Sequence, residues 1–243
     1  DASEALQAKD AEAIRQAIWN KRAYSPRAII DGRSLFELVT KPINGKDADW
    51  PFPGLNELTG GLRLGELCVW TAATGCGKST ATGEVCVSLI DQGFTVAYIA
   101  LEESVQRQAL RLMTVKANKP LHLNNEIPED ELRKAFDSSI GSGKVYLRSG
   151  FGSVDPDHLL NDIRFVVKNF VAQFVIIDHL SILLSGNTDD ERRMIDQVMT
   201  KLRSFVEETN IGMILISHLR RSHNDKGHEE GVKVSLNHLR GSH

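Results

Sequence analysis

The residues best suited to chemistry stand between positions 72 and 80, where the chain reads AATGCGKST. This segment fits the Walker A pattern that ends in Gly-Lys-Ser, with Ala72 where glycine is commoner. Glycines let such a loop turn its backbone N–H groups toward phosphate oxygens, and the positive end of a following helix points to the same place. A glycine-rich turn that binds nothing is the alternative. The candidate phosphate-binding residues are Thr74, Gly75, Cys76, Gly77, Lys78, Ser79 and Thr80.

The ligand that this loop predicts is a nucleoside triphosphate with Mg²⁺. Lys78 brings a mobile positive charge to the β- and γ-phosphates, and the Ser79 hydroxyl is placed to ligate the cation. Asp178 ends the apolar segment FVIID, and open α/β sheets bind ligands at the carboxyl ends of their strands. Asp178 is therefore the candidate Walker B residue and second metal ligand, unless it merely terminates a strand.

Hydrolysis of a nucleotide also needs a base that orients and deprotonates water. Many ATPases carry a glutamate directly after the Walker B aspartate, but His179 stands there in this chain. Glu102 ends the apolar segment TVAYIAL, and it reaches the same sheet edge if the two strands are neighbours. We therefore expect Glu102 to be the catalytic base. Glu103 competes with it, although we expect Glu103 to face the other way or to cap the helix that begins near Ser104.

Alternating strands and helices must position these side chains. Apolar segments predict strands, and amphipathic segments between them predict helices. Strands that are apolar on both faces indicate an α/β fold with a mostly parallel sheet covered by helices on both sides. The expected strands are residues 66–73, 95–101, 144–148, 174–178 and 212–217, and the expected helices are residues 79–91, 104–117, 128–138, 155–170 and 189–210.

The first 49 residues have a different character from the rest. Residues 2–19 are rich in Ala, Glu, Lys and Gln, which favours a helix, but only Leu6, Ile14 and Ile18 form its narrow apolar stripe. This helix either packs on its own domain or docks on a neighbour. A connector with one short helix at Ser34–Val39 follows. We therefore divide the chain into an N-terminal helix and connector, 1–49, and an α/β core, 50–243.

The composition narrows the functional classes. Of 243 residues, 41% are apolar and 25% are charged, which is typical of globular proteins. The net charge of −3 argues against a surface that binds polyanions everywhere, but a local basic patch is compatible with it. The apolar runs are far below the roughly 18–20 residues that span a bilayer, and we expect no secretory leader. Three cysteines without disulfide or zinc spacing predict a reducing, cytoplasmic location.

Several further motifs occur together with the Walker A loop. The segment 53–67 resembles the approach to the Walker A strand in RecA-like ATPases. The chain more specifically resembles the helicase half of phage-type primase-helicases, with Twinkle and the DnaB helicases as more distant relatives. The motifs that carry this resemblance are Leu101-Glu102-Glu103-Ser104, Ile177-Asp178-His179-Leu180-Ser181, residues 190–196, Ser217-His218-Leu219, His228-Glu229-Glu230-Gly231 and Leu239-Arg240-Gly241-Ser242.

This resemblance implies a RecA-like P-loop NTPase core in a ring-shaped, usually hexameric helicase. Such a helicase moves along single-stranded DNA while hydrolysing ATP or dTTP, and it works with replisome partners in the bacterial host cytoplasm if it is phage-encoded. The resemblance assigns the base to Glu102 and the γ-phosphate sensor to His218. Residues 1–19 correspond to a linker helix that packs on the adjacent subunit. No primase segment precedes the helicase motifs in this sequence, so we expect the chain to be either a helicase fragment or a form that lacks the primase, and we expect the last core strands and the arginine finger beyond His243.

The basic segment HLRRSHNDKGH at 218–228 is the candidate DNA contact. Arg220, Arg221 and Lys226 stand there against a single acid, and Arg240 belongs to a later loop that we also assign to DNA. Such loops hold backbone phosphates, and the lack of interleaved aromatic residues predicts little sequence preference. A short basic loop that is merely solvated is the alternative.

Three other functions share part of this pattern. A RecA-like recombinase or signalling ATPase has the same hydrolytic site without unwinding. A P-loop kinase phosphorylates a small molecule and carries an arginine-rich lid. A nucleotide-gated scaffold would bind without hydrolysis, but the presence of both Asp178 and Glu102 argues against it.

Overall fold

The computed structural model describes residues 31–40, 45–72, 75–121, 127–150, 154–179 and 188–218. Within these ranges it does not describe the side chains of Leu38, residues 188–193 and His218. The chain divides into two units, Asp1–Ile43 and Asn44–His243. The described part of the first unit holds a 3-10 helix, η1 (Gly32–Leu35), followed by the short helix α3 (Phe36–Val39), where one helix is predicted. The helix predicted over residues 2–19 lies outside the described residues.

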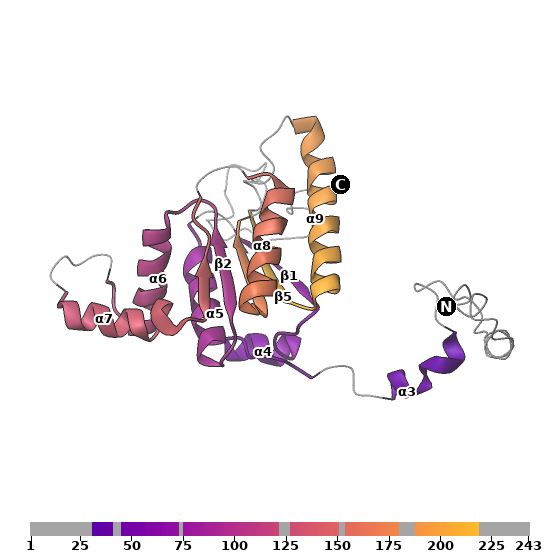
Figure 1. Cartoon of the computed structure of the whole chain (residues 1–243), viewed down its shortest axis with the longest axis horizontal. Helices are drawn as coiled ribbons and strands as arrows, with labels where there is room; N and C mark the ends of the chain where they lie inside the picture. The colour runs from indigo at the N-terminus through magenta and orange to yellow at the C-terminus, as the bar shows by residue number, and fades with distance from the viewer. Residues whose placement is uncertain are drawn as a thin grey trace, which may run out of the picture. The chain divides into compact units, whose positions relative to one another are not determined.

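The second unit is built on a parallel sheet (Figure 1). The strand order is β1-β5-β4-β2-β3, and every neighbouring pair is parallel. Each of the five predicted strands is present, with ends that differ from the prediction by no more than a few residues. Their bounds are β1 (Leu67–Ala72), β2 (Val96–Ala100), β3 (Val145–Leu147), β4 (Phe174–Asp178) and β5 (Gly212–His218).

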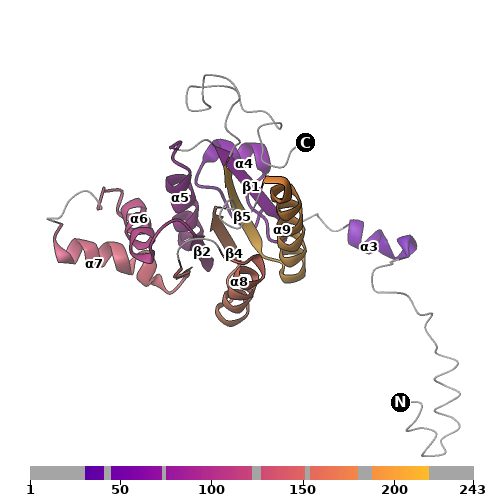
Figure 2. The same cartoon turned by 90° about the horizontal axis from the view of Figure 1, so that it is seen from above.

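Helices cover both faces of this sheet (Figure 2). Residues of α5 and α6 pack on the face that carries Val96, Tyr98 and Ala100, and residues of α8 and α9 pack on the face of Ala97 and Ile99. The predicted α/β class with a doubly covered parallel sheet is therefore confirmed. The helices of this unit are α4 (Pro53–Thr59), α5 (Lys78–Asp91), α6 (Val105–Ala117), α7 (Glu129–Asp137), the 3-10 helix η2 (Ile140–Ser142), α8 (Pro156–Phe170) and α9 (Thr188–Thr209).

The segment before β1 is part of this unit. The predicted domain boundary lies after residue 49, whereas Ala48 already pairs with Leu62 and is buried. Trp50 is buried as well, and its ring stacks on Trp70 of β1 with centroids 5.3 Å apart. Helix α4, which was not predicted from the sequence, begins at Pro53 and ends at Thr59, and Gly60 caps it in the left-handed conformation. None of the described helices is long and apolar enough to cross a membrane.

Gly212, the first residue of β5, lies where the sheet leaves no room for a side chain. A Cβ atom there would collide with the ring of Phe174 and would lie 3.1 Å from the carbonyl oxygen of Arg63. We expect Gly212→Ala to lower the free energy of unfolding by about 1–3 kcal/mol, because an added methyl group overpacks the core. Chemical denaturation measures this change.

Gly54 provides the matched control, because a Cβ atom there meets nothing within 4 Å and the residue lies in the first turn of α4. Gly54→Ala should leave stability unchanged or raise it slightly. Equal stability of the Gly212→Ala and Gly54→Ala variants would contradict the packing described for β5.

Candidate active site

The Walker A loop connects the end of β1 to the first residue of α5. Gly75 and Gly77 both have φ of 79°, a left-handed conformation that residues with a side chain rarely adopt. A Cβ atom at either position would meet nothing within 4 Å, so backbone conformation and not crowding accounts for glycine here. Gly77 also caps α5, whose first residues are Lys78, Ser79 and Thr80. The loop therefore has the helix N-terminus that phosphate binding uses. Thr74 lies outside the described residues.

Lys78 stands among the groups that the sequence analysis assigned to catalysis. Its ammonium group donates a hydrogen bond to the carbonyl oxygen of Ala72, with Nζ and oxygen 3.1 Å apart. Burial lowers the pKa of Lys78, while the electrostatic fields of Cys76, Asp178 and Glu102 act to raise it. Lys78 thus interacts electrostatically with both candidate carboxylates, as expected for charged groups that lie at one site.

The pairing of β2 with β4 brings these carboxylates together. Ala100 lies opposite Asp178 in the parallel register, and the N–H of Leu101 donates to the carbonyl oxygen of Asp178 over 2.8 Å. Glu102 therefore follows its strand at the edge where Asp178 ends its own. Burial is the main cause of the raised pKa of Glu102, the carboxylates of Asp178 and Glu103 add to it, and Lys78 opposes it.

His179 is a residue of this site that the sequence analysis did not assign. Its Nδ1 atom lies 3.4 Å from Oε2 of Glu102, a contact that becomes an ion pair when the imidazole is protonated. The His179 side chain is 4% exposed and that of Glu102 is 59% exposed, so a buried group faces an accessible carboxylate. The position of His179 directly after the Walker B aspartate was the available signal, because it shares the same sheet edge.

The two neighbouring glutamates point to different partners. Glu103 forms an ion pair with Arg111 of α6, whereas Glu102 contacts His179 after β4. Ser104, and not Glu103, caps α6 by accepting a hydrogen bond from the N–H of Arg107. This arrangement leaves Glu102 as the glutamate beside Asp178 and Lys78.

The oxygen donors at this edge suit Mg²⁺. Asp178 is 7% exposed at the end of β4, and Ser79 lies in the first turn of α5. Carboxylate and hydroxyl oxygens are hard ligands, and nucleotide-bound Mg²⁺ needs only one or two of them because phosphates and water complete its shell. Among the described residues no group of three or more His, Cys, Asp or Glu gathers as a metal centre.

The predicted sensor and DNA-contact residues stand differently. His218 ends β5 and its backbone pairs in register with Ala72, the last residue of β1, so it reaches the edge that carries the Walker A loop. Its side chain is not described. Arg220, Arg221, Lys226 and Arg240 lie outside the described residues.

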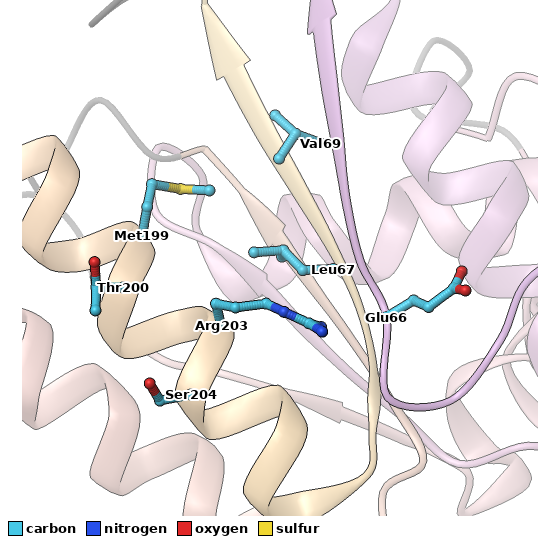
Figure 3. A pocket seen from close by; sticks show the side chains of 7 residues that line it. All are labelled: Glu66, Leu67, Val69, Met199, Thr200, Arg203 and Ser204. Carbon is cyan, nitrogen blue, oxygen red and sulfur yellow. The ribbon is translucent and has the colours of Figure 1, made fainter. Parts of the chain in front are cut away.

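A separate hollow lies between β1 and α9 (Figure 3). It measures about 660 Å³, and it lies beside the first half of β1 whereas the Walker A loop follows the last residue of that strand. It is therefore not part of the candidate active site. The lining residues are Glu66, Leu67, Val69, Met199, Thr200, Arg203 and Ser204.

Comparison with known proteins identifies the family. A family model described as an AAA domain matches residues 35–224, which include the Walker A loop, Glu102, Asp178 and His218. The chain belongs to this AAA domain family. The match extends over most of the chain and covers the strands that carry the site.

Relatives of this AAA domain include replication and repair proteins. It is 31% identical to the DNA helicase/primase of Enterobacteria phage T3, over 100% of this chain and 45% of that protein. It is 24% identical to the replicative DNA helicase DnaB of Leifsonia xyli, over 70% of this chain and 38% of that protein. The DNA repair protein RadA of Chlamydia muridarum is also 24% identical, over 70% of this chain and 31% of RadA. The chain thus spans less than half of each relative, and the resemblance to phage primase-helicases is confirmed.

Solved structures share the fold of this AAA domain. One solved ATPase domain superposes with a TM-score of 0.70 at 18% identity, and the match covers 87% of this chain and 79% of that one. A KaiC-like protein from Pyrococcus horikoshii gives a TM-score of 0.54 at 21% identity, over 72% of this chain and 71% of that one. These likenesses confirm the RecA-like ATPase fold.

The cysteines provide a direct test of the nucleotide site. Cys76 in the Walker A loop is exposed, Cys68 is half-buried and Cys86 is buried, and burial raises the pKa of both Cys68 and Cys86. We expect a thiol reagent to modify Cys76 first, because its thiol is exposed whereas the other two are partly or fully shielded from solvent. Mg²⁺ and nucleotide at about 100 times the Kd should slow this reaction about 100-fold, because only the free protein reacts. The rate of thiol modification measures this.

Cys76→Ser is the control, since it should remove the fast phase and leave the slow reaction of Cys68. Equal modification rates with and without nucleotide would show that the ligand does not cover this loop.

Proposed function

We propose that this chain is the motor domain of a replicative DNA helicase. It hydrolyses nucleoside triphosphates and moves along single-stranded DNA as one subunit of a ring, which we take to be a hexamer. The observation that carries the proposal is the meeting of Lys78, Asp178 and Glu102 at one sheet edge beside a Walker A loop. The similarity to the phage T3 helicase/primase and to DnaB favours a helicase over the other enzymes that share this edge.

The residues of the chain divide the work among them. Lys78 binds the β- and γ-phosphates, and the backbone N–H groups of the Walker A loop hold the remaining phosphate oxygens. Glu102 orients the attacking water and accepts its proton, and His179 keeps the carboxylate at the sheet edge. Mg²⁺, held by Ser79 and Asp178, supplies charge neutralisation on the phosphates. ATP and dTTP are the substrates that we propose.

DNA coupling falls to the residues after β5. His218 ends the strand beside β1, a position from which it can report the state of the nucleotide to the loop that follows. Arg220, Arg221, Lys226 and Arg240 then contact backbone phosphates in the ring channel. Residues 1–19 pack on the adjacent subunit, and the assembly works with replisome partners in the cytoplasm of the bacterial host.

A recombinase without unwinding activity is the second candidate. It is kept because a relative that is 24% identical over 70% of this chain, RadA of Chlamydia muridarum, is named a DNA repair protein and not a replicative helicase. An assay on forked DNA separates the two, because a helicase releases the displaced strand in a nucleotide-dependent reaction whereas a recombinase pairs strands. Nucleotide-dependent pairing without strand release would replace the first candidate by the second.

The first prediction of this proposal concerns the base. In the intact protein Glu102→Gln should bind nucleotide normally and lose turnover by about 10²–10⁴-fold, because the amide cannot accept the proton of water. Lys78→Ala should weaken nucleotide binding itself, because the phosphates lose their cation. Equilibrium binding of a fluorescent nucleotide and steady-state phosphate release measure the two effects.

Glu103→Gln is the matched comparison for Glu102→Gln, since both remove one carboxylate from the same turn. Its loss of turnover should be the smaller one. Normal turnover in Glu102→Gln together with loss in Glu103→Gln would move the base to Glu103.

The second prediction concerns DNA. Replacing Arg220 and Lys226 by glutamine should weaken binding of single-stranded DNA and reduce the slope of log K against log salt by about 0.7 for each phosphate that the protein no longer neutralises. His218→Ala should keep basal turnover and lose its stimulation by DNA. Lys168→Gln, at an exposed position of α8, is the charge control and should change neither. An unchanged salt slope in the double variant would place residues 218–228 outside the channel.

A further inference from the structure

The turn that carries Glu102 is held by a buried side chain of α6. Gln108 has no exposed surface, and its Nε2 group donates to the carbonyl oxygen of Ala100 over 2.9 Å and to that of Glu103 over 2.8 Å. These two carbonyl groups stand before and after Glu102 in the chain. A single amide group therefore ties together the backbone on both sides of the proposed base.

Glutamine suits this task better than other residues of its size. A carboxamide NH₂ offers two N–H donors without charge, so it serves two carbonyl oxygens in a buried place without the cost of burying an ion. A glutamate would bring oxygen against oxygen, and a methionine would fill the space without donating. The Oε1 atom has no hydrogen-bond partner among the described residues, so the polar contacts of this side chain are concentrated on the turn.

A second connection runs from the same turn to the Walker A helix. Glu103 pairs with Arg111, and Nη1 of Arg111 donates to the Tyr98 hydroxyl over 3.3 Å. The Tyr98 and Thr82 hydroxyl oxygens are 3.1 Å apart, and Thr82 donates to the carbonyl oxygen of Ser79 over 3.1 Å. Each hydroxyl then donates once and accepts once. The turn after β2 is thereby connected to the first turn of α5.

Glu102 needs this support because its own side chain is loosely held. It is 59% exposed, and its described side-chain contact is the one with His179 at 3.4 Å. Beyond this contact with His179, the position of its carboxylate depends on the backbone of the turn. A misplacement of about 1 Å can cost an enzyme about 100-fold in rate, so the fixation of this backbone has a kinetic consequence.

We propose that Gln108 and Arg111 are positioning residues for Glu102, Gln108 through the two flanking carbonyl groups and Arg111 through the carboxylate of Glu103. The proposal rests on the assignment of Glu102 as the base under the proposed function. Neither residue touches substrate in it, so both act on the rate of the chemical step and leave nucleotide affinity in place.

Gln108→Met in the intact protein is the first test. The variant keeps the approximate size of the side chain and removes both donors, so kcat should fall about 10- to 100-fold. The nucleotide Kd should stay within about twofold, since Lys78 and the Walker A loop are untouched. Leu112→Met is the matched control, because Leu112 is also fully buried on α6 and a methionine there disturbs packing without removing a hydrogen bond. Its kcat should stay near that of the parent protein.

A double-mutant cycle then separates positioning from general stability. If Gln108 acts through Glu102, Gln108→Met should cause no further loss of single-turnover rate in the Glu102→Gln background, because there is no base left to position. A full additional loss in that background would overturn the proposal. Normal turnover in Glu102→Gln would overturn the base assignment itself. Loss in Glu102→Gln with unchanged kcat in Gln108→Met would overturn positioning alone.

Arg111 provides a second test, at a position where a shorter side chain can be accommodated. It borders a cavity of about 520 Å³, so truncating it widens an existing hollow. Arg111→Met should lower kcat with little change in Kd, and Arg111→Lys should recover part of the loss by keeping a positive charge beside Glu103. Thermal melting shows whether the variants are folded. If Arg111→Met and Gln108→Met are both folded and have the same kcat as the parent protein, the proposal is overturned.

Discussion

Parallel pairing between β2 and β4 brings the proposed chemistry to one place. Ala100 lies opposite Asp178, and the N–H of Leu101 donates to the carbonyl oxygen of Asp178. Because parallel strands end at the same edge of a sheet, the residues that follow β2 and β4 are neighbours although the sequence separates them widely. Glu102, Asp178 and His179 owe their proximity to this pairing, and the Walker A loop reaches the same edge from β1.

The hydrophobic cores on the two faces of the sheet protect this register. Val96, Tyr98 and Ala100 pack on one face, and Ala97 and Ile99 pack on the other. A slip of one residue would exchange the two faces of a strand, which a sheet buried on both sides resists because each side chain is fitted to its own helical layer. Packing in the interior therefore fixes the positions of the site residues. Helix α6, which is part of this packing, holds the turn of Glu102 through the hydrogen bonds of Gln108.

The charged groups at this edge are energetically unfavourable in the protein without a ligand. Asp178 and Glu102 are like charges in a partly buried place, and together with burial Asp178 raises the pKa of Glu102. Burial also lowers the pKa of Lys78, so the charged forms of both groups are less favoured here than in water. Active sites commonly trade stability for function in this way. The triphosphate and Mg²⁺ that we propose as ligands would supply opposite charges for both signs present here.

Local pattern was enough to predict much of this protein. The Walker A residues, the strand that ends in Asp178 and the alternation of strands and helices follow from side-chain periodicity and glycine chemistry, which act over a few neighbouring residues. Short elements such as α4 were not predicted, because a seven-residue helix has little hydrophobic periodicity of its own. The strand order, the ion pair of Glu103 with Arg111, the contact of His179 with Glu102 and the bridge made by Gln108 required the tertiary structure. Each of these depends on groups that lie far apart in the chain, or on the direction in which a side chain leaves a turn, and only the packed arrangement of sheet and helices decides them.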